Sequence, residues 1–186
     1  MFSNIPNLLS LSRLPLAAGL FLAIAFDRWG GAAIIIAVAV FTDWLDGWWA
    51  RRYHCGTAVG RALDPLTDKV LICGAFVFLV PVRGLSVEPW VVTVVIAREL
   101  IVTAVRGMVE ATGQKFGADW FGKLKTALQF AVLFAALIVK KYETQILFGD
   151  YRRELEYGYL TLLGLMLAAT VGSALQYAVK AVRLLK

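Results

Sequence analysis

The sequence predicts an all-α, polytopic membrane protein with six transmembrane helices, and three observations support this prediction. The chain has 186 residues, and 60% of them are hydrophobic, whereas a soluble domain contains about 45–50% apolar residues. Several of its apolar stretches reach the length of about 20 residues that is needed to cross a hydrocarbon core. The segments between them are short, and nothing indicates a second, soluble domain. We therefore expect one transmembrane domain over residues 1–186.

The six predicted spans follow one another with short connections. They cover Ile5–Phe26, Gly31–Ala50, Asp64–Val82, Pro89–Val109, Trp120–Val139 and Tyr157–Val182. Tight turns are expected at Asp27–Gly30 and Arg83–Ser86, where glycine and polar residues interrupt the apolar pattern. Pro89 suits the first turn of a helix, because its missing N–H has no helical partner there.

The basic residues predict how the chain is oriented in the membrane. The net charge is +6, but the basic residues lie mostly at the ends of apolar segments, which fits topology signals and lipid head groups better than nucleic acid. The richer side carries Arg51, Arg52, Arg61, Lys69, Arg106, Lys115, Lys123, Lys125, Lys180, Arg183 and Lys186. Positive charge favours the cytoplasm. We therefore expect a bacterial inner-membrane protein with both termini in the cytoplasm.

Four aspartates at the ends of two apolar spans mark the candidate active site. Asp43 and Asp46 are three residues apart and share one helix face, and Asp64 and Asp68 are four apart and share another. Carboxylates within a span are costly and therefore point to function. An all-oxygen ligand set favours Mg²⁺ or Mn²⁺, and four carboxylates suit two ions better than one. One histidine and two cysteines are too few for a zinc site.

Small residues beside the aspartates leave room for a ligand. Gly47, Ala50 and Gly60 keep bulk away from the carboxylate faces, so a pyrophosphate could approach the backbone. Arg51 could grip it through a forked contact. Close helix packing is the alternative explanation for the three small residues. The pair Asp64–Pro65 is typical of an N-cap followed by proline at the first helical position.

These residues together form a signature with fixed spacing, Asp43-x2-Asp46-Gly47-x2-Ala50-Arg51-x8-Gly60-x3-Asp64-x3-Asp68. It resembles the signature of the CDP-alcohol phosphotransferase family at every position, and that family has six transmembrane helices. The resemblance implies two divalent cations on Asp43, Asp46, Asp64 and Asp68, with Asp68 as the general base. Such a base would take the proton of the acceptor hydroxyl as it attacks phosphorus. The implied contacts with the CDP-linked lipid are Asn7, Gly47, Ala50, Arg51, Thr57 and Gly60.

Basic residues outside the motif bear on the acceptor, the alcohol that receives the transferred group. Arg98 lies about 13 Å into the fourth span, so it must face a polar cavity or an internal partner. Because Ala127–Val139 is too short to cross the membrane, at about 20 Å, the fifth helix must begin earlier and contain Lys123 and Lys125. With Arg106, these lysines would form a pocket for an anionic acceptor. Membrane anchoring is the alternative explanation.

The wider sequence resembles one branch of the family, which transfers a phosphatidyl group from CDP-diacylglycerol to glycerol 3-phosphate. The segments that carry this resemblance are Asn4–Ser10 with Arg13, Thr42–Gly47, Leu63–Pro65 with Asp68–Val70, Ile96–Glu99 and Gly122–Ala127. It implies phosphatidylglycerophosphate and CMP as products, and it places Asn7 and Arg13 near the site. The candidate contacts with the acceptor phosphate are Arg106, Lys123, Lys125, Arg98 and Arg13.

Other functions stay open at this stage. An enzyme of the same fold could use phosphatidylglycerol, inositol phosphate or serine as acceptor, although serine would need the basic pocket less. The carboxylates could instead serve a Mg²⁺ or proton transporter, but the outer halves of the second and third spans are apolar. A stripe of small residues on the last span, Gly164, Ala168 and Gly172, would suit either a homodimer contact or internal packing.

Overall fold

The computed structural model describes residues 5–53, 58–112, 120–143 and 152–184. Within these ranges it describes the side chains of all residues except 5–10, 46–53, 58–65, 110–111, 152 and 183–184. The described residues form six α-helices and no strand, which confirms the predicted all-α class. The helices are α1 (Ile5–Ala25), α2 (Trp29–Tyr53), α3 (Ala58–Leu79), α4 (Pro89–Ala111), α5 (Trp120–Glu143) and α6 (Arg152–Leu184).

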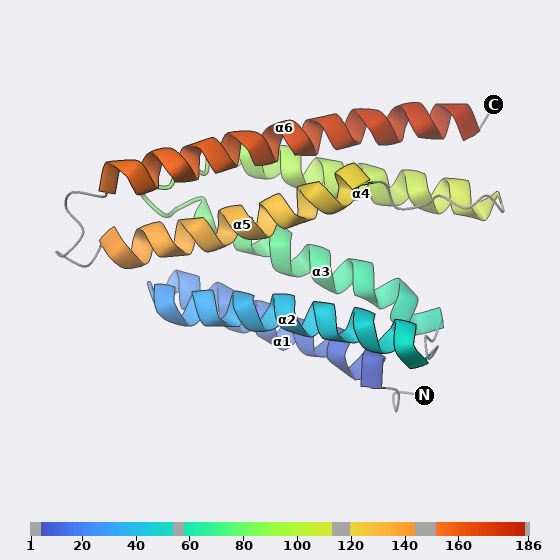
Figure 1. Cartoon of the computed structure of the whole chain (residues 1–186), viewed down its shortest axis with the longest axis horizontal. Helices are drawn as coiled ribbons and strands as arrows, with labels where there is room; N and C mark the ends of the chain where they lie inside the picture. Colours follow the sequence, from blue (N-terminus) through green and yellow to red (C-terminus); the bar gives the residue numbers. More distant parts are fainter. Residues whose placement is uncertain (1–4, 54–57, 113–119, 144–151, 185–186) are drawn as a thin grey trace.

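The helices form an elongated bundle in which α1 and α2 lie on one side and α4 and α6 on the other (Figure 1). Helices α3 and α5 lie between them, since α3 packs against α1 and α4, and α5 packs against α2 and α6. The first turn of α1 and the last turn of α6 lie at the same end of the bundle (Figure 1). We call this the terminal end.

Tight connections at the opposite end agree with the predicted turns. Between α1 and α2, Asp27 takes a left-handed φ of 55°, and the Arg28 N–H donates to the Ala23 carbonyl at 2.7 Å. Between α3 and α4, Gly84 has a φ of 84°, a conformation that glycine adopts without strain. The Lys140 ammonium of α5 donates to the Arg83 carbonyl at 2.9 Å and so ties this connection to the bundle.

The helix boundaries differ most from the predicted spans at α3 and α6. Helix α3 begins at Ala58, so Asp64 and Pro65 lie inside it, and their predicted role as N-cap and first helical residue was wrong. Pro65 cannot donate the helical hydrogen bond at its position, but the packing of α3 against α1 outweighs that local cost. Helix α6 extends beyond the predicted span at both ends, because charged residues can continue a helix outside the apolar layer.

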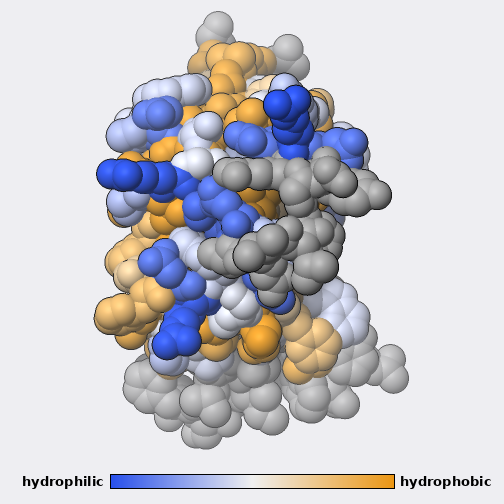
Figure 2. All heavy atoms as spheres, turned by 90° about the vertical axis from the view of Figure 1, so that its left-hand side faces the viewer, coloured by the Kyte–Doolittle hydropathy of each residue, from blue (hydrophilic) through white to orange (hydrophobic). Residues whose placement is uncertain are grey.

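Apolar surface and helix length make this an integral membrane protein. Among the described residues, Trp120–Glu143 and Arg153–Val182 are long and apolar enough to cross a membrane, and Leu11–Ala25 and Trp29–Leu45 are shorter apolar helices. Large hydrophobic side chains are exposed along the bundle, and Leu22 is one example. Viewed from the end opposite the termini, hydrophilic residues gather on the end face and hydrophobic residues lie around it (Figure 2).

The stripe of small residues on α6 faces outward. Gly164, Ala168 and Gly172 are exposed. A Cβ atom added at Gly164 or Gly172 would meet no heavy atom within 4 Å in the part of the chain that the structure describes. The stripe therefore does not serve internal packing within the described helices.

The buried stripes of the helices are mostly apolar toward the end opposite the termini and carry polar residues nearer the terminal end, where a second, smaller apolar cluster also forms. Buried residues recur every three or four positions, as expected for one helix face. The stripes are Arg13, Ala17, Leu20 and Ile24 on α1; Thr67, Leu71, Ala75 and Leu79 on α3; Val91, Val95, Arg98, Val102 and Val109 on α4; Lys125, Gln129, Val132 and Ala136 on α5; and Tyr159, Leu163, Met166, Thr170, Ser173, Tyr177 and Ala181 on α6. The polar positions on these stripes build the candidate site.

Candidate active site

The first part of the site is an ion pair between α1 and α2. Arg13 lies one turn before Ala17 on the buried face of α1, so its side chain enters the bundle and is 2% exposed. Its Nη2 lies 3.0 Å from Oδ1 of Asp43 on α2, whose side chain is 51% exposed. A buried cation without a partner would cost several kcal/mol, on the order given for buried ions. The pair therefore joins α1 to α2 and holds the Asp43 carboxylate in place.

Asp68 of α3 links this pair to a second polar region. Its side chain is half-buried. It lies within electrostatic range of Asp43 and Arg13, and also of Lys125 and Glu99. Charges interact over such distances because the interior screens them less than water does. Asp68 is therefore within electrostatic range of the α1–α2 ion pair and also of charged residues of α4 and α5.

Most of the other candidate residues for the metals and the CDP-linked lipid lie outside the described side chains. These are Asn7, Asp46, Gly47, Ala50, Arg51, Gly60 and Asp64, while Thr57 lies outside the described residues altogether. Helical register still places Asp46 on the face of α2 that carries Asp43. In the same way it places Asp64 on the face of α3 that carries Asp68. The predicted pairing of the carboxylates on two helix faces is thus compatible with the backbone.

The described carboxylates suit a divalent metal. Asp43 and Asp68 lie on different helices within range of one another's charge, and two like charges favour a cation between them. Their oxygens are the donors that Mg²⁺ and Mn²⁺ prefer. The described side chains include no group of three or more histidine, cysteine, aspartate or glutamate residues that could hold a metal, but they include only two of the four motif aspartates. The two described aspartates, half of the predicted metal ligands, thus have the chemistry that the predicted ions require.

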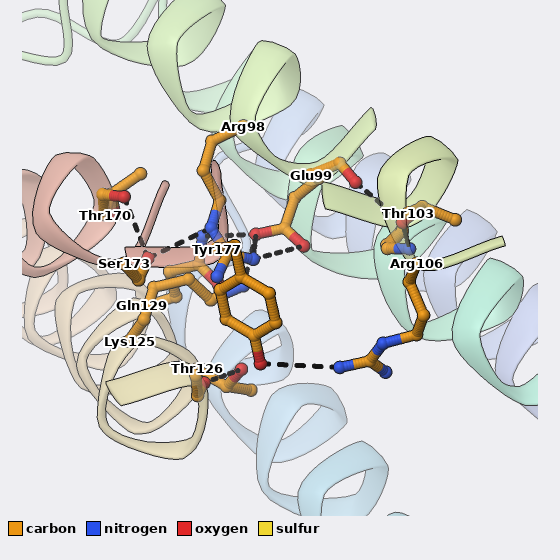
Figure 3. A network of polar contacts seen from close by, with 12 residues as sticks. Arg98, Glu99, Thr103, Arg106, Lys125, Thr126, Gln129, Thr170, Ser173 and Tyr177 are labelled. Atoms are coloured by element: carbon orange, nitrogen blue, oxygen red, sulfur yellow. Dashed lines mark hydrogen bonds and ion pairs between the residues drawn. The ribbon is translucent and has the colours of Figure 1, made fainter. Parts of the chain in front are cut away.

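The second part of the site surrounds Glu99 and joins α4, α5 and α6 (Figure 3). Lys125 of α5 donates a hydrogen bond to Glu99 Oε1 and forms an ion pair with it. Arg98 Nη1 lies 3.5 Å from both carboxylate oxygens, and Arg98 Nε donates to Ser173 Oγ at 3.1 Å. Gln129 Nε2 donates to Glu99 Oε1 at 3.4 Å. These five buried residues form what we call the Glu99 cluster.

The Glu99 cluster carries two cations, Arg98 and Lys125, and one carboxylate. Its net charge of about +1 would favour an anion, because the low dielectric strengthens attraction to an unbalanced charge. Glu99 also has a structural role, since it keeps the two cations from facing each other without a counter-charge.

Arg106 lies beside the Glu99 cluster and has different partners. It follows Glu99 by seven residues, hence on nearly the same face of α4. Its Nη2 donates to the Tyr177 hydroxyl at 3.4 Å, and its guanidinium carbon lies 5.9 Å from the centre of that ring. Its Nε is buried and has no hydrogen-bond partner among the described residues. Arg106 therefore retains donor capacity for a ligand.

Lys69 ties the two parts of the site together. It follows Asp68 on α3 and donates a hydrogen bond to Thr103 Oγ1 on α4. Thr103 in turn donates to the Glu99 carbonyl at 2.7 Å. Lys69 also lies within range of the charges of Glu99 and Arg106. The helix that carries Asp68 is thus attached to the helix that carries the basic residues, and the two parts adjoin.

The structure brings together three of the five candidate acceptor residues. Arg98, Arg106 and Lys125 lie in or beside the Glu99 cluster, whereas Arg13 pairs with Asp43. Lys123 is exposed and does not join the cluster, because side chains two residues apart point to different sides of a helix. The predicted internal partner of Arg98 is confirmed, as is the start of the fifth helix before Lys123.

Sequence reasoning missed several polar residues of the site. Gln129, Thr103, Ser173 and Tyr177 were not singled out, and Glu99 was noted without its partners. A usable signal existed for Gln129, which follows Lys125 by one helical turn on the same face. Ser173 and Tyr177 likewise lie four residues apart on α6. No pattern along the chain indicated which helices they would meet.

Comparison with known proteins identifies the family. A family model described as CDP-alcohol phosphatidyltransferase matches residues 3–175. The chain belongs to this family. A CDP-diacylglycerol–glycerol-3-phosphate 3-phosphatidyltransferase of Bacillus subtilis (strain 168) is 35% identical, and the match covers 73% of this chain and 77% of the relative. The protein with the same description in Escherichia coli (strain K12) is 37% identical over 70% of this chain and 74% of its own length.

The family assignment covers most of the site but not all of it. The matched segment of this CDP-alcohol phosphatidyltransferase includes the Arg13–Asp43 pair, Asp68 and Arg106. It ends two residues before Tyr177. The aromatic partner of Arg106 therefore lies beyond the part of the chain that the family description accounts for.

Proposed function

We propose that the chain transfers the phosphatidyl group of CDP-diacylglycerol to glycerol 3-phosphate, giving phosphatidylglycerophosphate and CMP in phospholipid biosynthesis. The observation that carries the proposal is that Asp68 lies within electrostatic range of both the Arg13–Asp43 pair and the Glu99 cluster. A transferase of this kind needs a donor site and an acceptor site that meet at the group handling the acceptor's proton. The descriptions of the two relatives support the choice of donor and acceptor.

The donor site would consist of the motif residues. The four aspartates, Asp43, Asp46, Asp64 and Asp68, would hold two divalent cations, Mg²⁺ or Mn²⁺. The chemistry that such ions supply when bound is neutralisation of the pyrophosphate charge as CMP leaves. Arg13 fixes the orientation of Asp43 through the 3.0 Å ion pair. The CDP-linked lipid would be contacted by Asn7, Gly47, Ala50, Arg51, Thr57 and Gly60.

Asp68 would act as the general base of the transfer. Its carboxylate accepts the proton of an acceptor hydroxyl while the hydroxyl oxygen forms a bond to phosphorus. The bond between that phosphorus and the oxygen of CMP breaks, and CMP leaves with the electron pair. The support for this role is the location of Asp68, which is within electrostatic range of charged residues in both parts of the site. No protein nucleophile is required, because the acceptor itself attacks.

The acceptor phosphate would bind at Arg106 and Lys125. Arg106 has a buried Nε without a described partner, and Lys125 lies within range of Asp68. Arg98 and Glu99 would hold Lys125 in place, and Lys123 would lie at the exposed margin of the site. A dianionic phosphate is a better match than neutral serine for this excess of positive charge.

The proposed membrane arrangement follows from the charge distribution. All six helices would cross the membrane as one domain over residues 1–186, with the site at the cytoplasmic end and both termini in the cytoplasm of a bacterial inner membrane. The shared position of the α1 start and the α6 end supports this arrangement (Figure 1). The exposed small-residue stripe of α6 would suit contact with a second copy of the chain.

Kinetics of an Arg106→Ala variant test the acceptor site. A charge-assisted hydrogen bond contributes about 1.5–3 kcal/mol, so the KM for glycerol 3-phosphate should rise about ten- to hundredfold. The KM for CDP-diacylglycerol should stay near that of the parent enzyme. Arg28→Ala is the matched control, because Arg28 is an exposed arginine at the opposite end of the bundle. Equal effects of Arg106→Ala on both substrates would contradict the proposal.

A further inference from the structure

Tyr177 of α6 occupies a position that the proposed reaction does not by itself explain. Its side chain is 3% exposed and lies between two guanidinium groups (Figure 3). The guanidinium carbons of Arg98 and Arg106 lie 5.5 Å and 5.9 Å from the centre of its ring, within the range of cation–π attraction. The Tyr177 hydroxyl accepts a hydrogen bond from Arg106 at 3.4 Å.

The two arginines depend on Tyr177 to different extents. Arg98 has other partners, because it donates to Ser173 Oγ and lies beside the Glu99 carboxylate. Arg106 has one hydrogen-bond partner among the described residues, and that partner is Tyr177. The ring and the hydroxyl of Tyr177 therefore set the orientation of Arg106, whereas Arg98 is oriented by the Glu99 cluster as well.

Gly122 in the first turn of α5 leaves room for the Tyr177 hydroxyl. A Cβ atom added at residue 122 would lie 3.0 Å from that oxygen and 3.8 Å from the ring atoms Cε2 and Cζ. The contact with the oxygen would be unusually tight, and the contacts with the ring atoms would be ordinary. A side chain at this position would therefore shift the hydroxyl by a few tenths of an ångström, which is enough to weaken a hydrogen bond that is already 3.4 Å long.

We propose that Tyr177 is a positioning residue that holds Arg106 toward the acceptor phosphate, with Gly122 making space for its hydroxyl. This inference rests on the proposed function, because the orientation of Arg106 affects turnover only if Arg106 binds the acceptor. An arginine held in place before binding loses less side-chain freedom when the phosphate arrives. Tyr177 acts through Arg106 and does not touch the reacting atoms.

Steady-state kinetics of Tyr177 variants test the inference. Tyr177→Phe removes the hydroxyl and keeps the ring, so the KM for glycerol 3-phosphate should rise about three- to tenfold. Both kcat and the KM for CDP-diacylglycerol should stay near the parent values. Gly122→Ala should reproduce this pattern, and Tyr177→Leu, which also removes the ring, should raise the same KM further.

Tyr159→Phe is the matched control for the loss of a buried hydroxyl. Tyr159 also lies on α6 and is 2% exposed. Its hydroxyl has no hydrogen-bond partner among the described residues. Parent kinetics are expected for this variant. Thermal melting of each purified variant separates a kinetic effect from a loss of fold, and if Tyr177→Leu does not fold, Tyr177→Phe and Gly122→Ala carry the test.

Combined variants distinguish this inference from the proposed function. In an Arg106→Ala background, Tyr177→Phe should have no further effect, because two residues that act through one contact are not additive. In a Tyr177→Phe background, Gly122→Ala should likewise add nothing. The positioning role would be overturned if the effects of Tyr177→Phe and Arg106→Ala on the KM were additive. It would also be overturned if Tyr177→Phe left the KM for glycerol 3-phosphate unchanged from that of the parent enzyme. In both cases Arg106→Ala would still show its acceptor defect, so the proposed function would stand. An Arg106→Ala variant with parent kinetics would overturn the acceptor site and the positioning role together.

Discussion

Replacement of Lys125 by methionine tests how the Glu99 cluster is held together. Methionine keeps an unbranched apolar chain but removes the ammonium group. Glu99, which is 6% exposed, would then lose its closer ion-pair partner and keep the ion pair with Arg98 at 3.5 Å and the hydrogen bond from Gln129 at 3.4 Å. Removal of one partner from a buried ion pair costs about 3–5 kcal/mol. Because Arg98 remains beside the same carboxylate, we expect the lower value, about 3 kcal/mol.

Thermal unfolding in detergent micelles measures this loss. At about 2–4 °C per kcal/mol for a chain of this size, Lys125→Met should lower the Tm by about 6–12 °C. Lys123→Met makes the same substitution at an exposed position of α5, so its Tm should shift by only about 1–2 °C.

The double variant Glu99→Gln/Lys125→Met separates stability from acceptor binding. It removes both charges of the pair, but it also takes the carboxylate away from buried Arg98 at 3.5 Å, so it should recover only part of the lost Tm, at most about half. The KM for glycerol 3-phosphate should nevertheless stay raised, because Lys125 is absent. A double variant as unstable as Lys125→Met, or a Lys125→Met protein with the parent Tm, would refute the reasoning that Glu99 and Lys125 balance each other.

Three further predictions concern the metals, the base and the topology. Asp43→Asn, and likewise Asp46→Asn and Asp64→Asn, should abolish CMP release while the folded protein stays in the membrane, and near-normal turnover in any of them would contradict a shared metal site. Asp68→Asn should lose turnover more completely than it loses binding of the CDP-linked lipid, measured by calorimetry; parallel loss of both would make Asp68 mainly a ligand. In intact cells, with Cys73 replaced by serine, Cys55 should resist a membrane-impermeant thiol reagent, and rapid labelling would reverse the predicted orientation.

The sequence predicted the local parts of the structure well because they depend on short-range patterns. Apolar length predicted the six helices, and the need for a fifth helix long enough to span the membrane predicted that Lys125 lies within it. The depth of Arg98 within its span predicted an internal partner, and Ser173 and Glu99 are such partners. Local signals failed at Asp64–Pro65, where packing extends α3 beyond a typical helix start.

The parts that the sequence did not predict depend on which helices face one another. Lys123 and Lys125 look equivalent along the chain, but α5 buries one and exposes the other. The partners of Glu99 come from α5 as well as α4, and Tyr177 is 71 residues away from Arg106 in the sequence. Such contacts are set by helix rotation in the bundle, and neither spacing nor residue type determines it.

The measurement that tests the central claim most directly is an acceptor panel with the purified protein. CDP-diacylglycerol and Mg²⁺ or Mn²⁺ would be combined in turn with glycerol 3-phosphate, glycerol, serine, myo-inositol, inositol phosphate and phosphatidylglycerol, while CMP release and the lipid product are followed. We predict that glycerol 3-phosphate gives phosphatidylglycerophosphate and CMP in equal amounts, and that the other acceptors are poor. Efficient use of another acceptor would reject glycerol 3-phosphate as the substrate. If no acceptor in the panel led to CMP release, the claim that the chain is a phosphatidyltransferase of this kind would be contradicted.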